Sequence, residues 1–240
     1  MTLYAPTHVI FDMDGTTVRH INPWILNVLE NLDDLSYKIG HWTTNNLGFK
    51  KMKKPLGGVV TRDPEKKKRL LVHKALHSVR KKDLNKIVEP CPGIFDVLTL
   101  LKEHNIPMGI ASNGLGKGYG HDILEEFDLE DFFETRIFRE DLRHAKPHPE
   151  ALLKAISSYQ QPPSGGDVIW YIGDRWKDIQ AAFAAQPHVK ADIIPFAYGL
   201  NATLHSFVEG KLSPQQRVVD YSDLRELLLK LFSTKKQSAT

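Results

Sequence analysis

Apolar and polar positions along this chain repeat in a strand-then-helix pattern. Five short apolar runs are strand candidates: THVIF at 7–11, IPMGIAS at 106–112, DVIWYIGD at 167–174, ADIIPFA at 191–197 and RVVD at 217–220. Their Val- and Ile-rich character is typical of parallel strands that are buried on both faces. Helical patterns lie between them, and in the stretch 93–104 the apolar residues keep helical spacing. The pattern predicts an α/β fold, with a doubly wound parallel sheet covered by helices on both faces.

The stretch from 18 to 88 interrupts this pattern. Asn22-Pro23 and Asp63-Pro64 each combine a helix N-cap residue with a proline suited to the first helical position. Two helices are therefore expected between the first strand and the rest of the sheet. The predicted domains are a Rossmann-like core of residues 1–17 and 89–240 and an inserted α-helical cap of residues 18–88.

The composition is that of a folded protein. Of the 240 residues, 41% are apolar and 25% are charged, which is enough to form a full hydrophobic core. No apolar run approaches the ~20 residues that a membrane-spanning helix needs, and the N-terminus lacks the basic stretch of a secretory signal. Cys91 is the single cysteine, which excludes an intramolecular disulfide and a cysteine-based zinc site. We expect a cytoplasmic protein without membrane contact.

Positive charge is concentrated in one part of the predicted cap. The whole chain carries a net charge of +3, but residues 50–86 hold 14 Lys and Arg against 3 Asp and Glu, a local charge of +11. The rest of the chain therefore carries −8. Three explanations stay open for this basic segment: a solvated face, a cap that gathers an anionic substrate, or a surface that docks nucleic acid or another protein.

Aspartates follow two of the predicted strands at the point where each strand ends. Asp12 and Asp14 lie two apart, so their side chains start on the same face of the first strand. Asp174 ends a later strand, and Asp178 lies one helical turn beyond it. If the two strands are neighbours, Asp12, Asp14 and Asp174 converge at the edge of the sheet where doubly wound folds bind ligands. A cluster of hard oxygen ligands with little histidine or thiol nearby favours Mg²⁺.

A hydroxyl group and an ammonium group accompany these carboxylates. Ser112 ends a third predicted strand and is followed by Asn113 and Gly114, so a hydroxyl and backbone N–H groups can face the same crevice. Lys146 stands just before a predicted helix in HAKPHPEALLKAI and can place a fixed positive charge there. A metal ion, an ammonium, a hydroxyl and backbone amides around a free carboxylate describe phosphoryl transfer through an aspartyl-phosphate.

A glycine-rich stretch, GLGKGYG at 114–120, follows the third predicted strand. It does not match G-x-G-x-x-G, because Tyr119 and His121 occupy positions that need glycine. It does not match a P-loop either, because Ala111 and Gly118 stand at two of the required positions. We predict a flexible loop beside the site.

Four motifs in this order resemble those of the haloacid dehalogenase superfamily: FDMDGT, IASNG, KPHPEALL and YIGDRWKDI. The resemblance covers residues 7–16 and about 90–200, and it is closest to the phosphoglycolate-phosphatase-like branch. It implies a Rossmann-like core with a helical cap inserted between the first and second motifs. Two other activities of the superfamily fit less well. Dehalogenases lack the second acid, which is Asp14 here, and transport ATPases carry a lysine where Met13 stands.

The resemblance also implies a role for each residue that matches a motif. The implied nucleophile and Mg²⁺ ligand is Asp12, and the implied general acid and base is Asp14, which also binds Mg²⁺ through its carbonyl. The remaining roles are substrate binding by Ser112, Asn113 and Lys146, metal ligation by Asp174, and support of the site by Thr16 and Asp178.

The implied function is that of a Mg²⁺-dependent phosphatase, a phosphoric monoester hydrolase acting on a small phosphorylated metabolite. A phosphomutase and a nucleotide or sugar phosphatase of the same fold are alternatives, because they keep the same motifs. A non-enzymatic module that binds an anionic partner through the basic cap is a further alternative, which the intact motifs disfavour. Substrate choice is expected to reside in the cap, whose sequence is unfamiliar, and the oligomeric state is left open.

Overall fold

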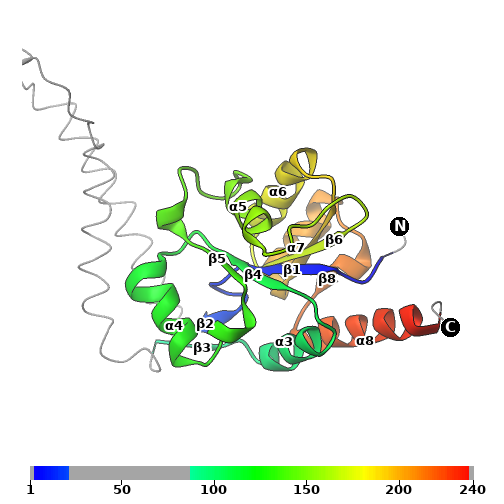
Figure 1. Cartoon of the computed structure of the whole chain (residues 1–240), viewed down its shortest axis with the longest axis horizontal. Helices are drawn as coiled ribbons and strands as arrows, with labels where there is room; N and C mark the ends of the chain where they lie inside the picture. The colour runs from blue at the N-terminus through cyan, green and yellow to red at the C-terminus, as the bar shows by residue number, and fades with distance from the viewer. Residues whose placement is uncertain (1–2, 22–86, 238–240) are drawn as a thin grey trace, which may run out of the picture. The chain divides into compact units, whose positions relative to one another are not determined.

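The computed structural model describes residues 3–21 and 87–237 (Figure 1). The chain divides into two compact units, of which one comprises Met1–Arg19 with Val88–Thr240 and the other His20–Ile87. Almost all of the second unit lies outside the described residues. The predicted helical cap at 18–88 therefore stays a prediction, as does any role of the basic segment at 50–86.

A six-stranded parallel sheet forms the centre of the first unit. Its strands, in spatial order, are β5 (Thr135–Ile137), β4 (Met108–Ala111), β1 (His8–Phe11), β6 (Val168–Gly173), β7 (Asp192–Tyr198) and β8 (Arg217–Val218). The chain runs from β1 outward to β4 and β5, and then returns to the other side of β1 for β6, β7 and β8. The strand order thus reverses at β1, which confirms the doubly wound parallel sheet. Ligands in such sheets bind at this reversal, beyond the carboxyl ends of the strands.

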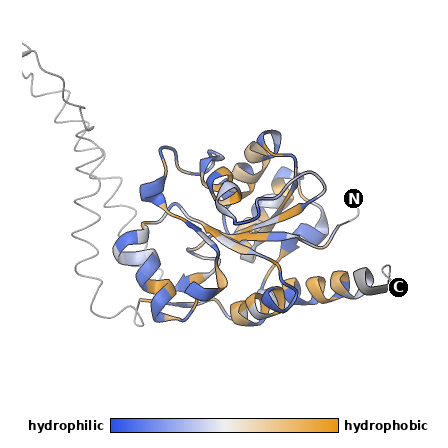
Figure 2. Cartoon of the chain, viewed as in Figure 1, coloured by the Kyte–Doolittle hydropathy of each residue, from blue (hydrophilic) through white to orange (hydrophobic). Residues whose placement is uncertain are grey.

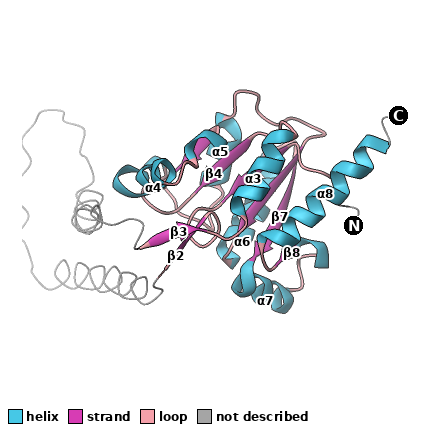
Figure 3. Cartoon of the chain, turned by 90° about the horizontal axis from the view of Figure 1, so that it is seen from below, coloured by secondary structure: helices cyan, strands magenta, loops and turns pink. Residues whose placement is uncertain are grey.

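Helices cover both faces of the sheet, as parallel strands require. One face carries α5 (Glu150–Ser158) and α6 (Trp176–Ala185), and the opposite face carries α3 (Ile94–Glu103) and α8 (Tyr221–Gln237) (Figures 1 and 3). The helix α7 (Gly199–Glu209) packs on β7 and β8, and α4 (His121–Glu126) follows the glycine-rich loop. Short turns of helix also occur at 116–120, 130–132, 139–141, 186–188 and 214–216. Within the described part of the chain, no helix is both long enough and apolar enough to cross a bilayer.

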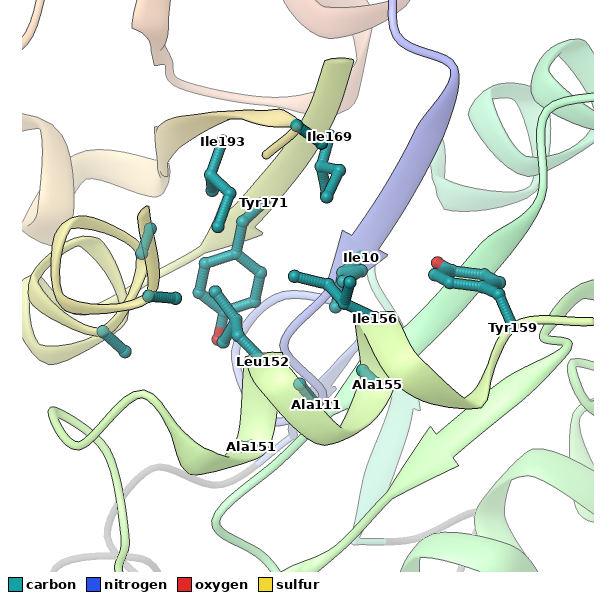
Figure 4. Packing of buried hydrophobic residues seen from close by; sticks show 14 of the residues in the cluster. Ile10, Ala111, Ala151, Leu152, Ala155, Ile156, Tyr159, Ile169, Tyr171 and Ile193 are labelled. Carbon is teal, nitrogen blue, oxygen red and sulfur yellow. The ribbon is translucent and has the colours of Figure 1, made fainter. Parts of the chain in front are cut away.

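An apolar layer lies between the sheet and the helices α5 and α6. Apolar residues concentrate on the central strands (Figure 2), and Leu152 and Ile156 of α5 pack against Ile10 and Tyr171 of the sheet (Figure 4). Each of these side chains is at most 5% exposed. Removing a buried leucine side chain from such a layer costs about 2–5 kcal/mol. The layer therefore holds both helices against this face of the sheet.

A second, two-stranded sheet pairs β2 (Val18–His20) with β3 (Val88–Pro90), which the sequence did not predict. An ion pair with 2.7 Å between Arg19 Nη2 and Glu89 Oε1 links the two strands. The strands connect the core to both ends of the segment at 22–86.

Candidate active site

The turn after β1 brings the backbone of Gly15 against Asp174. The carbonyl of Met13 accepts backbone N–H bonds from Thr16, Thr17 and Val18 at 2.8–3.3 Å, which closes the turn. Gly15 has a φ of +85°, and a Cβ atom added there would lie 2.2 Å from Oδ2 of Asp174. Only glycine fits this position, because it accepts the left-handed backbone and leaves room for the carboxylate.

Lys146 is the centre of a buried polar network. Its ammonium nitrogen lies 2.5 Å from Oδ1 of Asp12 and 2.7 Å from Oδ1 of Asp178. The same nitrogen is 2.8 Å from the hydroxyl of Tyr171 and 2.9 Å from the carbonyl of Ala111. Only 1% of the Lys146 side chain is exposed. One fixed positive charge therefore holds two carboxylates, one just after the end of β1 and the other in the first turn of α6.

Hydrogen bonds to the backbone fix the loop that carries Lys146. The backbone N–H of Lys146 donates to Oδ1 of Asn113 at 2.9 Å, and Nδ2 of Asn113 donates back to the carbonyl of Lys146 at 3.4 Å. Nearer α5, the Glu150 carboxylate accepts the N–H groups of Arg143 and His144 at 2.8–3.1 Å. The side chain of Asn113 thus positions Lys146, and a contact between Asn113 and substrate stays a prediction.

Three carboxylates gather beside Lys146. Asp12, Asp174 and Asp178 each place one oxygen within 4.8 Å of the others. Asp178 accepts the N–H of Arg175 at 3.1 Å, whereas Oδ1 of Asp174 is buried without a hydrogen-bond partner among the described residues. A buried carboxylate oxygen without a partner is costly unless a ligand satisfies it. The group contains the predicted metal ligands Asp12 and Asp174 together with Asp178, which was predicted to support the site.

The charge balance of this cluster calls for a cation. Burial, together with the nearby Asp178 and Asp174, raises the pKa of Asp12 to about 7 in spite of the adjacent Lys146. Burial and Asp178 likewise raise the pKa of Asp174 to about 6. Burial opposes the charge of Lys146, but Asp12 and Asp178 outweigh it and hold the pKa of Lys146 well above its ordinary value. A single ammonium does not balance three neighbouring carboxylates, of which Asp12 and Asp178 are buried and Asp174 is partly buried, so these residues fit a divalent cation with oxygen ligands.

The carboxylate of Asp14 lies on another side of the site, next to the end of β4. Its Oδ1 accepts a hydrogen bond of 2.5 Å from the hydroxyl of Tyr119. A Cβ atom added to Gly114 would lie 2.9 Å from Oδ2 of Asp14 and 3.2 Å from Oγ of Ser112. The Asp14 carboxylate, the Ser112 hydroxyl and the backbone of Gly114 are therefore close neighbours.

Two hydroxyl groups complete the set of predicted site residues. Oγ of Ser112, 1% exposed, accepts the N–H of Gly114 at 2.9 Å. Thr16 is fully buried, and its Oγ1 has no hydrogen-bond partner in the described parts of the chain. The structure thus gathers every residue that the motifs singled out around the ends of β1, β4 and β6.

Sequence reasoning missed Tyr171 and Tyr119, which touch the predicted site residues directly. Tyr171 lies within the apolar run of β6, where the pattern predicts core packing alone. Side chains alternate between the two faces of a strand, and this alternation places Tyr171 on the face covered by α5 and α6. That placement is the one signal in the sequence that could have pointed to a contact with Lys146. Tyr119 lies in the glycine-rich loop, where no pattern fixes side-chain direction.

Comparison of the sequence with known proteins finds one matching family model and relatives with phosphatase names. A family model described as haloacid dehalogenase-like hydrolase matches residues 9–191. The chain is 29% identical over 172 residues to the pyrophosphatase PpaX of Oceanobacillus iheyensis, covering 71% of this chain and 76% of that protein. It is 26% identical over 208 residues to the phosphoglycolate phosphatase of Nitrosococcus oceani, covering 83% of this chain and 87% of that protein.

A solved structure shares the fold. The crystal structure of a HAD-superfamily hydrolase from Ehrlichia chaffeensis matches with a TM-score of 0.57 and 22% identity, over 96% of this chain and all of that one. At this identity, the likeness concerns the fold.

Proposed function

The chain belongs to the haloacid dehalogenase-like hydrolase family and is a phosphatase, and within that class we propose that it hydrolyses a small phosphomonoester through an aspartyl-phosphate on Asp12, with Mg²⁺ as cofactor. The observation that carries this proposal is the buried contact between Lys146 and Asp12, which is one of the three clustered carboxylates. A nucleophile needs one free oxygen and a fixed orientation. Lys146 supplies the orientation by holding Oδ1.

Hydrolysis then proceeds in two steps. In the first, the other oxygen of Asp12 forms a bond to phosphorus while the bond from phosphorus to the ester oxygen breaks, and Asp14 gives its proton to the leaving alkoxide. In the second, water attacks the phosphorus of the aspartyl-phosphate and releases the carboxylate of Asp12, and Asp14 takes the proton from the water. The free acid form of Asp14 is thereby restored. Ser112 and Lys146 hold the phosphoryl oxygens through both steps.

The metal is proposed to be held by Asp12, Asp174 and the backbone carbonyl of Asp14, with Asp178 in support. The set fits the group because Oδ1 of Asp174 is buried without a partner among the described residues and the donors are hard oxygens. When bound, Mg²⁺ neutralises charge on the carboxylates and the phosphate. Asp178 also bonds to Lys146, so it links the metal side of the site to the phosphate side.

The proposed substrate is a small phosphorylated metabolite, and the proposed location is the cytoplasm. Relatives named phosphoglycolate phosphatase and pyrophosphatase make 2-phosphoglycolate and pyrophosphate the first compounds to examine. The alternative of a phosphomutase differs only in the second step, where the phosphoryl group passes to a product hydroxyl instead of water.

The test uses the purified full chain. Phosphate release from p-nitrophenyl phosphate and from a panel of phosphorylated metabolites, pyrophosphate and sugar phosphates is measured with Mg²⁺ and with excess EDTA. We expect Mg²⁺-dependent release that Asp12→Asn abolishes. Full activity in EDTA would refute the metal, and activity retained by Asp12→Asn would refute the aspartyl-phosphate. Transfer between two hydroxyls of a sugar phosphate without phosphate release would identify a mutase.

A further inference from the structure

The glycine-rich loop at Gly114–Gly120 presents a buried tyrosine to the active site. The hydroxyl of Tyr119 donates a hydrogen bond of 2.5 Å to Oδ1 of Asp14, across 105 positions of the chain. Tyr119 is 5% exposed, so most of its side chain is buried. We propose that Tyr119 is a positioning residue for Asp14, and that the glycine-rich loop serves to seat its hydroxyl there. This inference rests on the proposed function, in which Asp14 is the general acid and base.

The loop is held at both ends by hydrogen bonds. The carboxylate of Glu140 accepts the backbone N–H of Gly116 at 2.8 Å and that of Lys117 at 2.7 Å. The carbonyl of Gly114 accepts the N–H of Arg139 at 2.8 Å, and the N–H of Gly120 donates to the carbonyl of Leu115 at 3.0 Å. The structure shows a hydrogen-bonded turn in this segment, and the flexibility that the sequence suggests for the loop stays a prediction. Such a turn can hold a side chain in one place.

Two glycines let this turn pack directly on Phe138, which is fully buried. A Cβ atom added to Gly116 would lie 2.7 Å from the Phe138 ring, and one added to Gly120 would lie 2.4 Å from it. At a third position, Gly118 has a φ of +76°, which favours glycine. The spacing of glycines therefore follows from contact with an aromatic ring and from backbone direction. It does not follow from nucleotide binding, which the motif only superficially suggests.

The hydrogen bond from Tyr119 holds the carboxyl group of Asp14 through one of its oxygens. Tyr119 occupies Oδ1, and Oδ2 is the oxygen nearer to Gly114, whose added Cβ atom would approach it to 2.9 Å. Proton transfer to a leaving group needs an acid at a fixed position, because a displacement of about 1 Å can cost ~100-fold in rate. With Oδ1 held by Tyr119, the carboxyl group of Asp14 keeps one position, from which it exchanges the proton with substrate and water.

Substitution Tyr119→Phe tests this role, because it removes the hydroxyl and keeps the buried ring. The measurement is kcat/KM, which reports the steps up to formation of the aspartyl-phosphate, for two esters. An alkyl phosphate has a poor leaving group that needs a proton, whereas p-nitrophenyl phosphate releases a stable anion without one. We expect kcat/KM on the alkyl phosphate to fall at least about tenfold, since general acid catalysis contributes ~10²–10⁴-fold in total. On p-nitrophenyl phosphate the fall should stay within about threefold, because that reaction does not depend on the acid.

A matched control separates this effect from general damage to the fold. Tyr159→Phe also removes a buried hydroxyl, one that donates to the carbonyl of Val9 at 3.1 Å and lies outside the site. It should change the ratio of the two kcat/KM values by less than about twofold, because it leaves the proton donor untouched. Glu140→Gln, which weakens the hold on the loop, should show the same selective loss as Tyr119→Phe at a smaller size. Glu130→Gln, at a distant exposed ion pair with Arg136, should not.

Each outcome decides the matter. An equal loss on both esters would show that Tyr119 is merely structural, and no loss on either would show that it does not position Asp14; both overturn the inference while leaving the phosphatase intact. If the wild-type protein hydrolyses neither ester, and its rate does not differ from that of Asp12→Asn, the proposed function is refuted and the inference with it.

Discussion

The ammonium nitrogen of Lys146 lies 2.5 Å from Oδ1 of Asp12, although 134 positions separate the two residues along the chain. Both side chains are almost fully buried. Removing one partner of a buried ion pair leaves an uncompensated charge and commonly costs about 3–5 kcal/mol. Tests of Asp12 as the proposed nucleophile should therefore change the chemistry of its side chain and keep its size and its contact with Lys146.

Asp12→Asn meets this condition. The amide keeps an oxygen that can accept from Lys146, but it is neither a nucleophile nor a good metal ligand. We expect phosphate release to fall to no more than a few per cent of the wild-type rate while the circular dichroism spectrum is retained. A folded variant that keeps substantial turnover would exclude Asp12 as the nucleophile.

Asp174→Asn should remove metal binding that can be observed without turnover. A ligand that binds only the folded state at ~100 times its Kd adds about 2.7 kcal/mol to the free energy of unfolding. Mg²⁺ should therefore raise the melting temperature of the wild-type protein and leave that of Asp174→Asn unchanged. The control is Asp192→Asn, an exposed change at the start of β7, at the opposite end of the sheet from the site. Equal stabilisation of all three proteins would contradict the assignment of Asp174.

Gly15→Ala should destabilise the protein more than Gly166→Ala. Both glycines have positive φ, +85° and +94°, so alanine is strained at either position by about 1–2 kcal/mol. At Gly166 nothing lies within 4 Å of the added Cβ atom, whereas at Gly15 it would meet the Asp174 carboxylate at 2.2 Å. We expect the free energy of unfolding, measured in urea, to fall by at least about 3 kcal/mol at Gly15. Equal losses at the two positions would show that Asp174 can move away.

Glu150→Gln should reveal a pH-dependent contribution to stability. The backbone N–H of Arg143, followed by that of His144, lowers the pKa of Glu150 from 4.5 to about 2 in the folded protein. The folded state therefore binds fewer protons than the unfolded state, and the stability from this carboxylate is present above pH 4.5 and is lost as the pH falls toward about 2.

The corresponding measurement compares unfolding in urea for wild type and Glu150→Gln across this pH range. The variant should be less stable at pH 7, and the difference should shrink below pH 4.5. A difference that is constant with pH would mean that Glu150 acts by packing instead of by charge.

The sequence was sufficient to predict the sheet and the residues at its carboxyl edge, because buried parallel strands leave a continuous apolar signal. Asp12, Ser112 and Asp174 each follow such a strand, so their convergence could be expected once β1, β4 and β6 were taken as neighbours. The edge strand β5 was missed, because Thr135–Ile137 is three residues long and carries an arginine. A strand this short has no periodicity to detect.

Contacts between distant side chains were beyond the reach of sequence patterns. The side chains of Asp12 and Asp14 were expected to start on the same face, since residues two apart on a strand share a face. The tight turn at Gly15 follows closely after β1, which ends at Phe11, so neither aspartate is a strand residue. It turns Asp14 toward Tyr119, a residue whose direction depends on how its loop packs on Phe138.

Tyr171 belongs to two parts of the molecule at once. Its ring lies in the apolar layer under α5 and α6 (Figure 4). Its hydroxyl lies 2.8 Å from the ammonium nitrogen of Lys146 and donates to Oδ1 of Asp178 at 3.2 Å. Loosening of that layer on heating would therefore also misalign Lys146 and Asp178, which belong to the proposed active site. Thermal inactivation and thermal unfolding should coincide, so the enzyme is not expected to pass through a folded but inactive form as the temperature rises.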